Sequence, residues 1–249
     1  MKTTNYWIGH FTENASRKRV DWNISPSITQ DEIAVILTSL QAWQLGETSE
    51  GKNLIAASIK YAKKIDDPLY VDAVKLFIKE EQKHGNNLGR YLDKISKPRI
   101  KKNWGDTLFR RVRYFNTSME MWTLAVITVE STAQIFYQAL KDATRCPVLK
   151  SICTDILIDE AYHITFQTER LAMIYNIAGY KNRRRVAYAC FFYATSCLVW
   201  FAHRRLFKAG GNTFQSYLKK MRYKYIKTIN TITDQSNYEA PKIALNYEC

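Results

Sequence analysis

Apolar side chains recur every three or four residues in four long stretches of the chain, which is the spacing of one face of an α-helix. These stretches cover approximately residues 30–64, 68–95, 116–143 and 147–178. Thr29 and Glu32 form a capping-box pattern before the first stretch, and Pro68 and Pro147 stand where the second and fourth begin. No strand pattern of useful length appears. The sequence therefore predicts an all-α chain built on four long helices.

Acidic and imidazole side chains interrupt the apolar faces of these helices in a repeated order. A lone Glu on one helix is followed by a proline and then by Glu-x-x-His on the next helix. The first copy consists of Glu50, Pro68, Glu81 and His84, and the second consists of Glu130, Pro147, Glu160 and His163. Because Glu and His three residues apart project to the same side of a helix, the repeat predicts that four carboxylates and two imidazoles converge.

The choice of the first carboxylate depends on register along the first helix. Glu47 and Glu50 share a face, and Gly46 and Gly51 flank Glu50. Aligning the two copies on their prolines favours Glu50 as the ligand and leaves Glu47 as an alternative ligand or a group that supports one.

A metal site is the simplest reason for these residues to occupy apolar helix faces. An unpaired buried carboxylate is costly, so such a group normally has a partner or a metal. The alternative interpretation is a pair of polar contacts on the helix surfaces. Mixed carboxylate and imidazole ligands suit iron or manganese, and the lack of thiolates argues against structural zinc. We expect two metal ions per chain, with iron first and manganese or a mixed Mn/Fe pair as alternatives.

These motifs resemble those of the ferritin-like di-iron carboxylate superfamily over approximately residues 30–178. The resemblance implies a four-helix bundle with a long crossover between its second and third helices, the place of the basic segment near 97–113. In several oxygenase members an acidic residue precedes the Glu of Glu-x-x-His and orients a ligand histidine. Glu80 and Asp159 hold those places here. Tyr137, two turns beyond Glu130, is a candidate redox tyrosine, although core packing is the simpler interpretation.

The segments outside the bundle carry weaker signals. Residues 1–29 have no sustained period and predict an irregular arm, residues 179–233 predict two further helices packed on the bundle, and 234–249 predict a tail. The uncharged run 186–202 sits at the lower length limit for a membrane span, but arginines stand at both ends. A helix buried against the bundle or a dimer partner is the favoured interpretation. His203, which follows this run, is read as a capping or interface residue.

The positive charge of the chain is concentrated at its C-terminal end. The chain carries a net charge of +14, and residues 180–249 contain 13 Lys and Arg against 3 Asp and Glu. A soluble surface is the simplest reading, and docking of an acidic electron-transfer partner is the favoured functional one. Anionic lipid and RNA are less favoured. The five cysteines show no metal-type pairing and no secretion signal is recognised, so we expect reduced thiols and a cytoplasmic location. We also expect a homodimer.

Three functions are compatible with this pattern. The first is an oxidase or oxygenase that activates O2 at a di-iron or Mn/Fe centre to oxidise a small organic substrate in the bundle core. The second is an iron-handling, ferroxidase or peroxide-removing protein. The third is an RNA-modifying di-iron hydroxylase. The length beyond a minimal bundle favours the first, a non-haem di-iron oxidoreductase.

Overall fold

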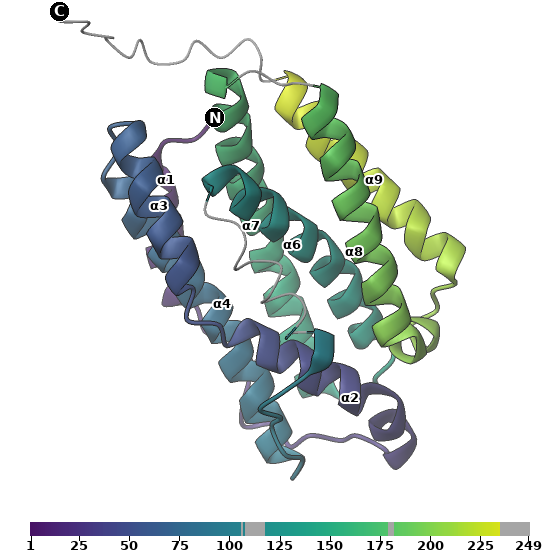
Figure 1. The fold of residues 1–249 in the computed structure, drawn as a ribbon. Coiled ribbons are helices and arrows are strands. Elements are labelled where there is room, and N and C mark those ends of the chain that lie inside the picture. The colour runs from purple at the N-terminus through teal and green to yellow at the C-terminus, as the bar shows by residue number, and fades with distance from the viewer. Residues whose placement is uncertain (106, 108–117, 179–181, 235–249) are drawn as a thin grey trace, which may run out of the picture.

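Helices account for the regular secondary structure in the computed structural model, which describes residues 1–105, 107, 118–178 and 182–234 (Figure 1). In chain order the elements are α1 (Thr4–Ala15), α2 (Gln30–Glu47), α3 (Lys52–Lys64), α4 (Leu69–Lys94), α6 (Met119–Asp142), α7 (Pro147–Ala178), α8 (Asn182–Ala209) and α9 (Phe214–Asp234). The all-α prediction is confirmed.

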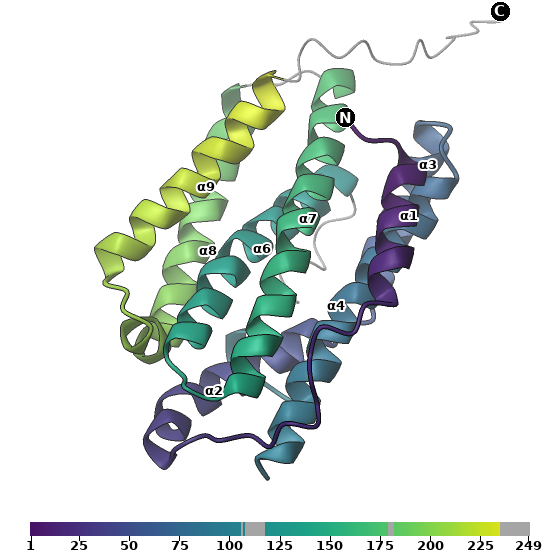
Figure 2. The ribbon, with the colours of Figure 1, turned by 180° about the vertical axis from the view of Figure 1, so that it is seen from behind.

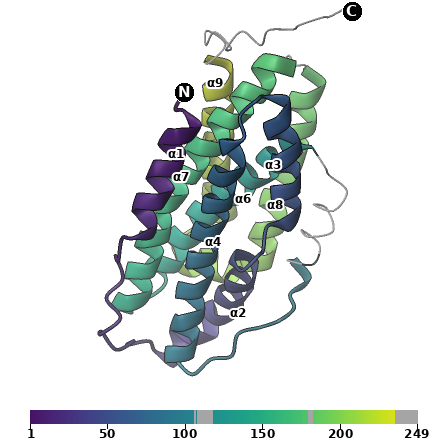
Figure 3. The same ribbon diagram turned by 90° about the vertical axis from the view of Figure 1, so that its left-hand side faces the viewer.

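The bundle that carries the repeat consists of α4, α6, α7 and the consecutive pair α2 and α3. Helix α4 contacts α2, α3 and α7, and α6 contacts α3 and α7 (Figure 3). Its core contains fully buried apolar side chains from α2, α4, α6 and α7, including Leu40, Leu88, Ile127, Phe136 and Ile156. Each such side chain contributes roughly 1.5–3 kcal/mol through burial. This packing holds the polar residues of the repeat at fixed positions between the helices.

The first predicted helix is not continuous. Helix α2 ends at Glu47 and α3 begins at Lys52, and Gly51 between them has a φ of 64°. A Cβ atom on Gly51 would lie 2.5 Å from Cδ1 of Ile78 on α4, so the chain passes too close to α4 for a side chain at this point. The prediction of one helix over 30–64 is wrong at this turn.

The connection from α4 to α6 spans residues 95–118, of which 106 and 108–117 lie outside the described residues. Both α4 and α6 run downward in Figure 1, so α6 begins toward the end of the bundle opposite to the one where α4 ends. This agrees with the predicted long crossover. Of its basic residues, 97–102 are described and Arg110, Arg111 and Arg113 are not.

The N-terminal arm contains a helix that the sequence interpretation missed. Helix α1 is capped by Thr3, whose hydroxyl accepts the Tyr6 N–H at 3.2 Å, and it packs along α4 (Figure 2). Its buried residues are Thr4, Trp7, Phe11 and Asn14, a helical stripe with steps of three, four and three. The expectation of an irregular arm is therefore wrong for residues 4–15.

Helices α8 and α9 pack on the side of the bundle opposite α1 (Figure 2). Helix α8 contacts α2, α6 and α9, and α9 contacts α6 and α7. The segment Arg184–Ala209 is long and apolar enough to cross a membrane by length and composition alone, yet only 22% of its most apolar window is buried. The interpretation of α8 as a buried helix therefore holds for one face only. The predicted tail lies mostly outside the described residues.

Candidate metal centre

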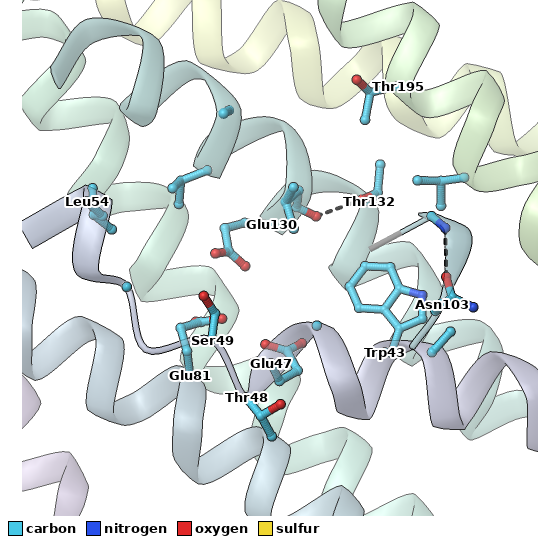
Figure 4. Close-up of a pocket in the computed structure, with 18 of the residues that line it drawn as sticks. Trp43, Glu47, Thr48, Ser49, Leu54, Glu81, Asn103, Glu130, Thr132 and Thr195 are labelled. Carbon is cyan, nitrogen blue, oxygen red and sulfur yellow. Dashed lines mark hydrogen bonds between the residues drawn. The ribbon is translucent and has the colours of Figure 1, made fainter. Parts of the chain in front are cut away.

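Carboxylate and imidazole groups from four helices meet inside the bundle. Ligand atoms of Glu81, Glu130, Glu160 and His163 all lie within 4.8 Å of one another, and those of Glu47, Glu81 and His84 do the same. Glu81 belongs to both groups, so the two groups adjoin. Figure 4 shows the carboxylates of Glu47, Glu81 and Glu130 directed toward a common space. Five of the six residues of the predicted repeat are therefore brought together.

Glu50 is the exception. The turn after α2 takes it away from the other carboxylates, and its exposed side chain pairs with Lys52 at 2.5 Å. That ion pair lowers the pKa of the Glu50 carboxyl through a hydrogen bond and direct attraction. Glu47, the last residue of α2, is buried and takes the place expected for Glu50. The preference for Glu50 over Glu47 is corrected, because the shared helix face ends where the helix ends.

Several buried atoms in this cluster have no hydrogen-bond partner. They are Glu81 Oε1, His84 Nδ1, both carboxylate oxygens of Glu160 and His163 Nδ1. His163 Nδ1 lies 2.7 Å from Glu81 Oε1, but without the geometry of a hydrogen bond. Unpartnered buried polar atoms cost free energy, and metal ions are the partners that carboxylate oxygens and neutral imidazole nitrogens share. The donor atoms therefore fit two metal ions.

The electrostatics of the cluster also favour bound cations. Burial raises the pKa of Glu47 and of Glu130 well above the usual value, with further repulsion from Glu81 and Glu160 respectively. Burial raises the pKa of Glu160 to about 7, and Glu81 adds to the shift. Four clustered carboxylates repel one another in this environment, whereas two divalent cations would balance their charge.

Each imidazole is held from its other side by an acidic residue of the opposite motif. His84 Nε2 on α4 lies 3.1 Å from Asp159 Oδ2 on α7, and His163 Nε2 on α7 lies 2.7 Å from Glu80 Oε2 on α4. Glu80 and Asp159 therefore occupy the supporting positions predicted for them. A carboxylate that accepts the Nε2 proton leaves Nδ1 free to face the cluster.

The two supporting carboxylates are joined by a residue that the sequence interpretation did not select. The Asn14 side-chain amide on α1 donates to Glu80 and, at 2.8 Å, to Asp159. Arg19 Nη1 donates to Asp159 at 2.8 Å, and Lys83 Nζ donates to the other oxygen of Asp159 at 2.9 Å. Burial would raise the pKa of Asp159, but the hydrogen bond and attraction from His84, together with the bonds from Lys83 and Asn14, hold it far below its usual range. The signal in the sequence that could have identified Asn14 is the helical spacing of Thr4, Trp7, Phe11 and Asn14.

A cavity of about 880 Å³ adjoins the cluster and contains Glu47, Glu81 and Glu130 in its wall (Figure 4). Much of the remaining wall is apolar, and it comes from α2, α4, α6 and α8, with Trp43, Trp122 and Leu198 among its members. The metal-binding groups are thus next to a space that suits a small organic molecule.

No family model matches the sequence, and no curated protein matches it. Among solved structures, an R2-like ligand-binding oxidase mutant with an anaerobically reconstituted Mn/Fe cofactor matches with a TM-score of 0.60. The sequence identity is 16%, and the match covers 94% of this chain and 93% of the other. The fold is that of this R2-like oxidase. A second mutant, with an aerobically reconstituted Mn/Fe cofactor, matches with a TM-score of 0.56 at 16% identity over 94% and 92% of the two chains.

The comparison confirms the expected ferritin-like bundle, and it covers 94% of this chain. The R2-like fold thus extends well beyond the segment in which the sequence motifs were recognised. At 16% identity the likeness is one of fold.

Proposed function

We propose that this protein is a non-haem di-metal oxidoreductase that uses O2 to oxidise a small organic molecule in the cavity beside Glu47, Glu81 and Glu130. The observation that carries this proposal is that the candidate metal centre and the cavity share part of their walls. Three carboxylates of the candidate metal centre also line a largely apolar cavity of about 880 Å³. A substrate in that cavity would contact the metal-binding groups directly.

The residues present divide into two ligand sets. Glu47, Glu81 and His84 would hold one metal, and Glu81, Glu130, Glu160 and His163 would hold the other. Iron, or manganese with iron, supplies redox chemistry toward O2 when bound at such a site. The Mn/Fe cofactor of the structural neighbours makes these two metals the first to test.

The protein's own side chains orient the ligands and shape the space around them. Asp159 and Glu80 fix the two imidazoles, and the Tyr137 hydroxyl donates to Glu47 at 2.6 Å. Apolar side chains from α6 and α8 line the space beside the carboxylates, and a less polar surrounding strengthens the interaction of a carboxylate with a cation. An apolar approach also favours an organic substrate over hydrated iron ions, and this supports an oxidase over an iron-storage protein.

Metal analysis with a matched pair of variants tests the proposal. The protein is loaded with Fe(II), or with Mn(II) and Fe(II), without O2, and bound metal is counted before O2 uptake is recorded. We expect two metals per chain and O2 uptake that depends on them. Glu47→Gln should lose metal, whereas Glu50→Gln, three residues away and exposed, should bind as the unmodified protein does.

Three results would contradict the proposal. The first is a protein that takes up neither metal. The second is an equal loss of metal in both variants, which would mean that charge near the turn matters and the buried cluster does not. The third is the uptake of many iron atoms per chain, which would indicate storage.

A further inference from the structure

The uncharged run 186–202 of helix α8 is largely apolar around its whole circumference, yet among the described residues it is packed on one side only. Tyr188, Phe192, Ser196 and Trp200, each four residues from the next, are buried. A helix that is apolar on all sides is normally enclosed by protein or lipid. The opposite side of α8 has no such cover within the part of the chain that the structure describes.

The uncovered side forms a continuous apolar stripe. Val186, Leu198 and Phe201 are 63%, 48% and 62% exposed. Cys190, Ala194 and Ala202 are exposed between and beside them and complete the four-residue spacing from 186 to 202. At 1.5 Å per residue the stripe is about 25 Å long.

Positive charge frames this stripe at both ends. Arg185 precedes it, Arg204, Arg205 and Lys208 follow it, and all four side chains are exposed. Helix α8 contains no acidic residue. Near the C-terminal end of α8, the ring centroids of Phe201 and Phe214 lie 5.8 Å apart. Arg204 and Lys208 line the same surface groove as these two rings.

We propose that this face of α8 docks on the surface of an anionic lipid bilayer, with the apolar stripe among the acyl chains and the cations at the headgroups. An apolar stripe combined with cations is the pair of signals that holds an interfacial helix on a membrane. A full span does not fit, because the other side of α8 is packed against the bundle and its two ends carry the same charge.

A second copy of the chain fits this face less well. Self-association through α8 would bring basic ends together in either relative orientation, since the helix offers no acidic partner. RNA would use the cations but leave the 25 Å apolar stripe in water. Both charge and apolar area thus favour lipid.

The docking face is continuous with the cavity beside the glutamates. Ala194, Leu198 and Ala202 belong to the exposed stripe and also line that cavity. Docking would therefore place the cavity next to the lipid. The docking itself stands on α8 alone and does not depend on the proposed function.

Flotation of the metal-loaded protein with lipid vesicles tests the docking. The vesicles consist of phosphatidylcholine, with or without phosphatidylglycerol, and binding should require the anionic lipid. Changing Arg204, Arg205 and Lys208 together to Gln should weaken binding on the order of a hundredfold, given the attraction of each cation to an anionic surface. Phe201→Ser should weaken it roughly tenfold through lost apolar contact.

Matched controls lie on α3, at the edge of the bundle opposite α8 in Figure 1. Changing Lys60, Lys63 and Lys64 together to Gln removes the same charge, and Ile59→Ser removes a side chain that is 43% exposed. These variants should bind vesicles as the unmodified protein does, and all variants should keep their metal. Metal content thus separates failure of docking from failure of the proposed function.

Three outcomes overturn the docking. The first is equal binding to both vesicle types, and the second is an equal loss of binding in the α3 and α8 charge variants. The third is a stable dimer or an RNA complex that keeps the protein from vesicles and is lost with the same α8 substitutions.

Discussion

The Tyr137 hydroxyl donates a 2.6 Å hydrogen bond to Oε1 of Glu47. The two residues come from α6 and α2, and both are buried. Burial, with the nearby Glu81, raises the pKa of Glu47, whereas the bond from Tyr137 opposes that shift. Tyr137 therefore favours the charged carboxylate, which is the form that binds a metal. Glu47 ends its helix, so this bond also fixes the position of its side chain.

Tyr137→Phe should weaken metal binding at the group formed by Glu47, Glu81 and His84. Loss of a supporting hydrogen bond typically lowers metal affinity by roughly tenfold to a hundredfold. Competitive titration with Mn(II) or Fe(II) against a chelator measures the change. Tyr91→Phe is the control, since Tyr91 is equally buried on α4 but its hydroxyl lies beside the Cys146 thiol. Unchanged affinity in Tyr137→Phe would show that Glu47 is held by other contacts.

A second prediction concerns Asn14, which connects α1 to the carboxylates that support the candidate metal centre. Asn14→Ala removes the donor shared by Glu80 and Asp159 and should lower the free energy of unfolding by about 1–3 kcal/mol. Asn14→Asp has the same size but adds a third carboxylate, so it should lower that free energy further. Urea unfolding measures both, with exposed Asn23→Ala as the control.

If Asn14 acts only on stability, metal affinity will be the same in all these variants. We expect it to fall in both Asn14 variants, because the supporting carboxylates then hold His84 and His163 less firmly.

The five residues of the predicted repeat that the structure brings together lie inside uninterrupted helices. Glu81 with His84, Glu130, and Glu160 with His163 sit in α4, α6 and α7, where the 3.6-residue period carries a side chain's direction along the helix. Their convergence follows from periodicity alone. The supporting roles of Glu80 and Asp159 depended on likeness to known oxygenases, and the crossed pairing of each with the other motif's histidine needed the structure.

Glu47 and Asn14 were beyond the reach of periodicity for different reasons. The choice between Glu47 and Glu50 depends on where α2 ends, and α2 ends just before a turn in which Gly51 lies close to Ile78 on another helix. Asn14 lies on a helix of twelve residues whose stripe has only four members. A pattern that short is weak evidence until the partner helix is known.

His203 predicts a dependence of stability on pH. Its Nδ1 lies 3.0 Å from the Ser39 hydroxyl, between α8 and α2, and burial lowers the pKa of its imidazole to about 4. The folded state thus favours neutral His203, while the unfolded chain takes up a proton near pH 6.5. As pH falls from 6.5 toward 4, this difference should remove up to about 3 kcal/mol of stability.

His203→Gln should make the loss of stability over that pH range shallower. Urea unfolding of the metal-free protein at several pH values measures the slope, and the difference between the two proteins isolates His203 from the carboxylates. Identical slopes would mean that the imidazole reaches water in the folded state.

The turn after Glu47 offers two glycines with opposite expectations. Gly46 is in α2 and exposed, and a Cβ there meets no atom within 4 Å. Gly46→Ala should therefore raise the free energy of unfolding by about 1 kcal/mol through helix propensity. Gly51→Ala should lower it by about 1–3 kcal/mol, because an alanine at positive φ is strained and its Cβ meets Ile78.

Metal affinity separates the two glycine variants further. A shift of the turn or of α4 that relieves the strain at position 51 would move Glu47 relative to Glu81. We therefore expect Gly51→Ala to bind metal more weakly and Gly46→Ala to bind as the unmodified protein does, measured by the same chelator competition. Equal affinity in both variants would show that Glu47 is positioned by Tyr137 and not by the turn.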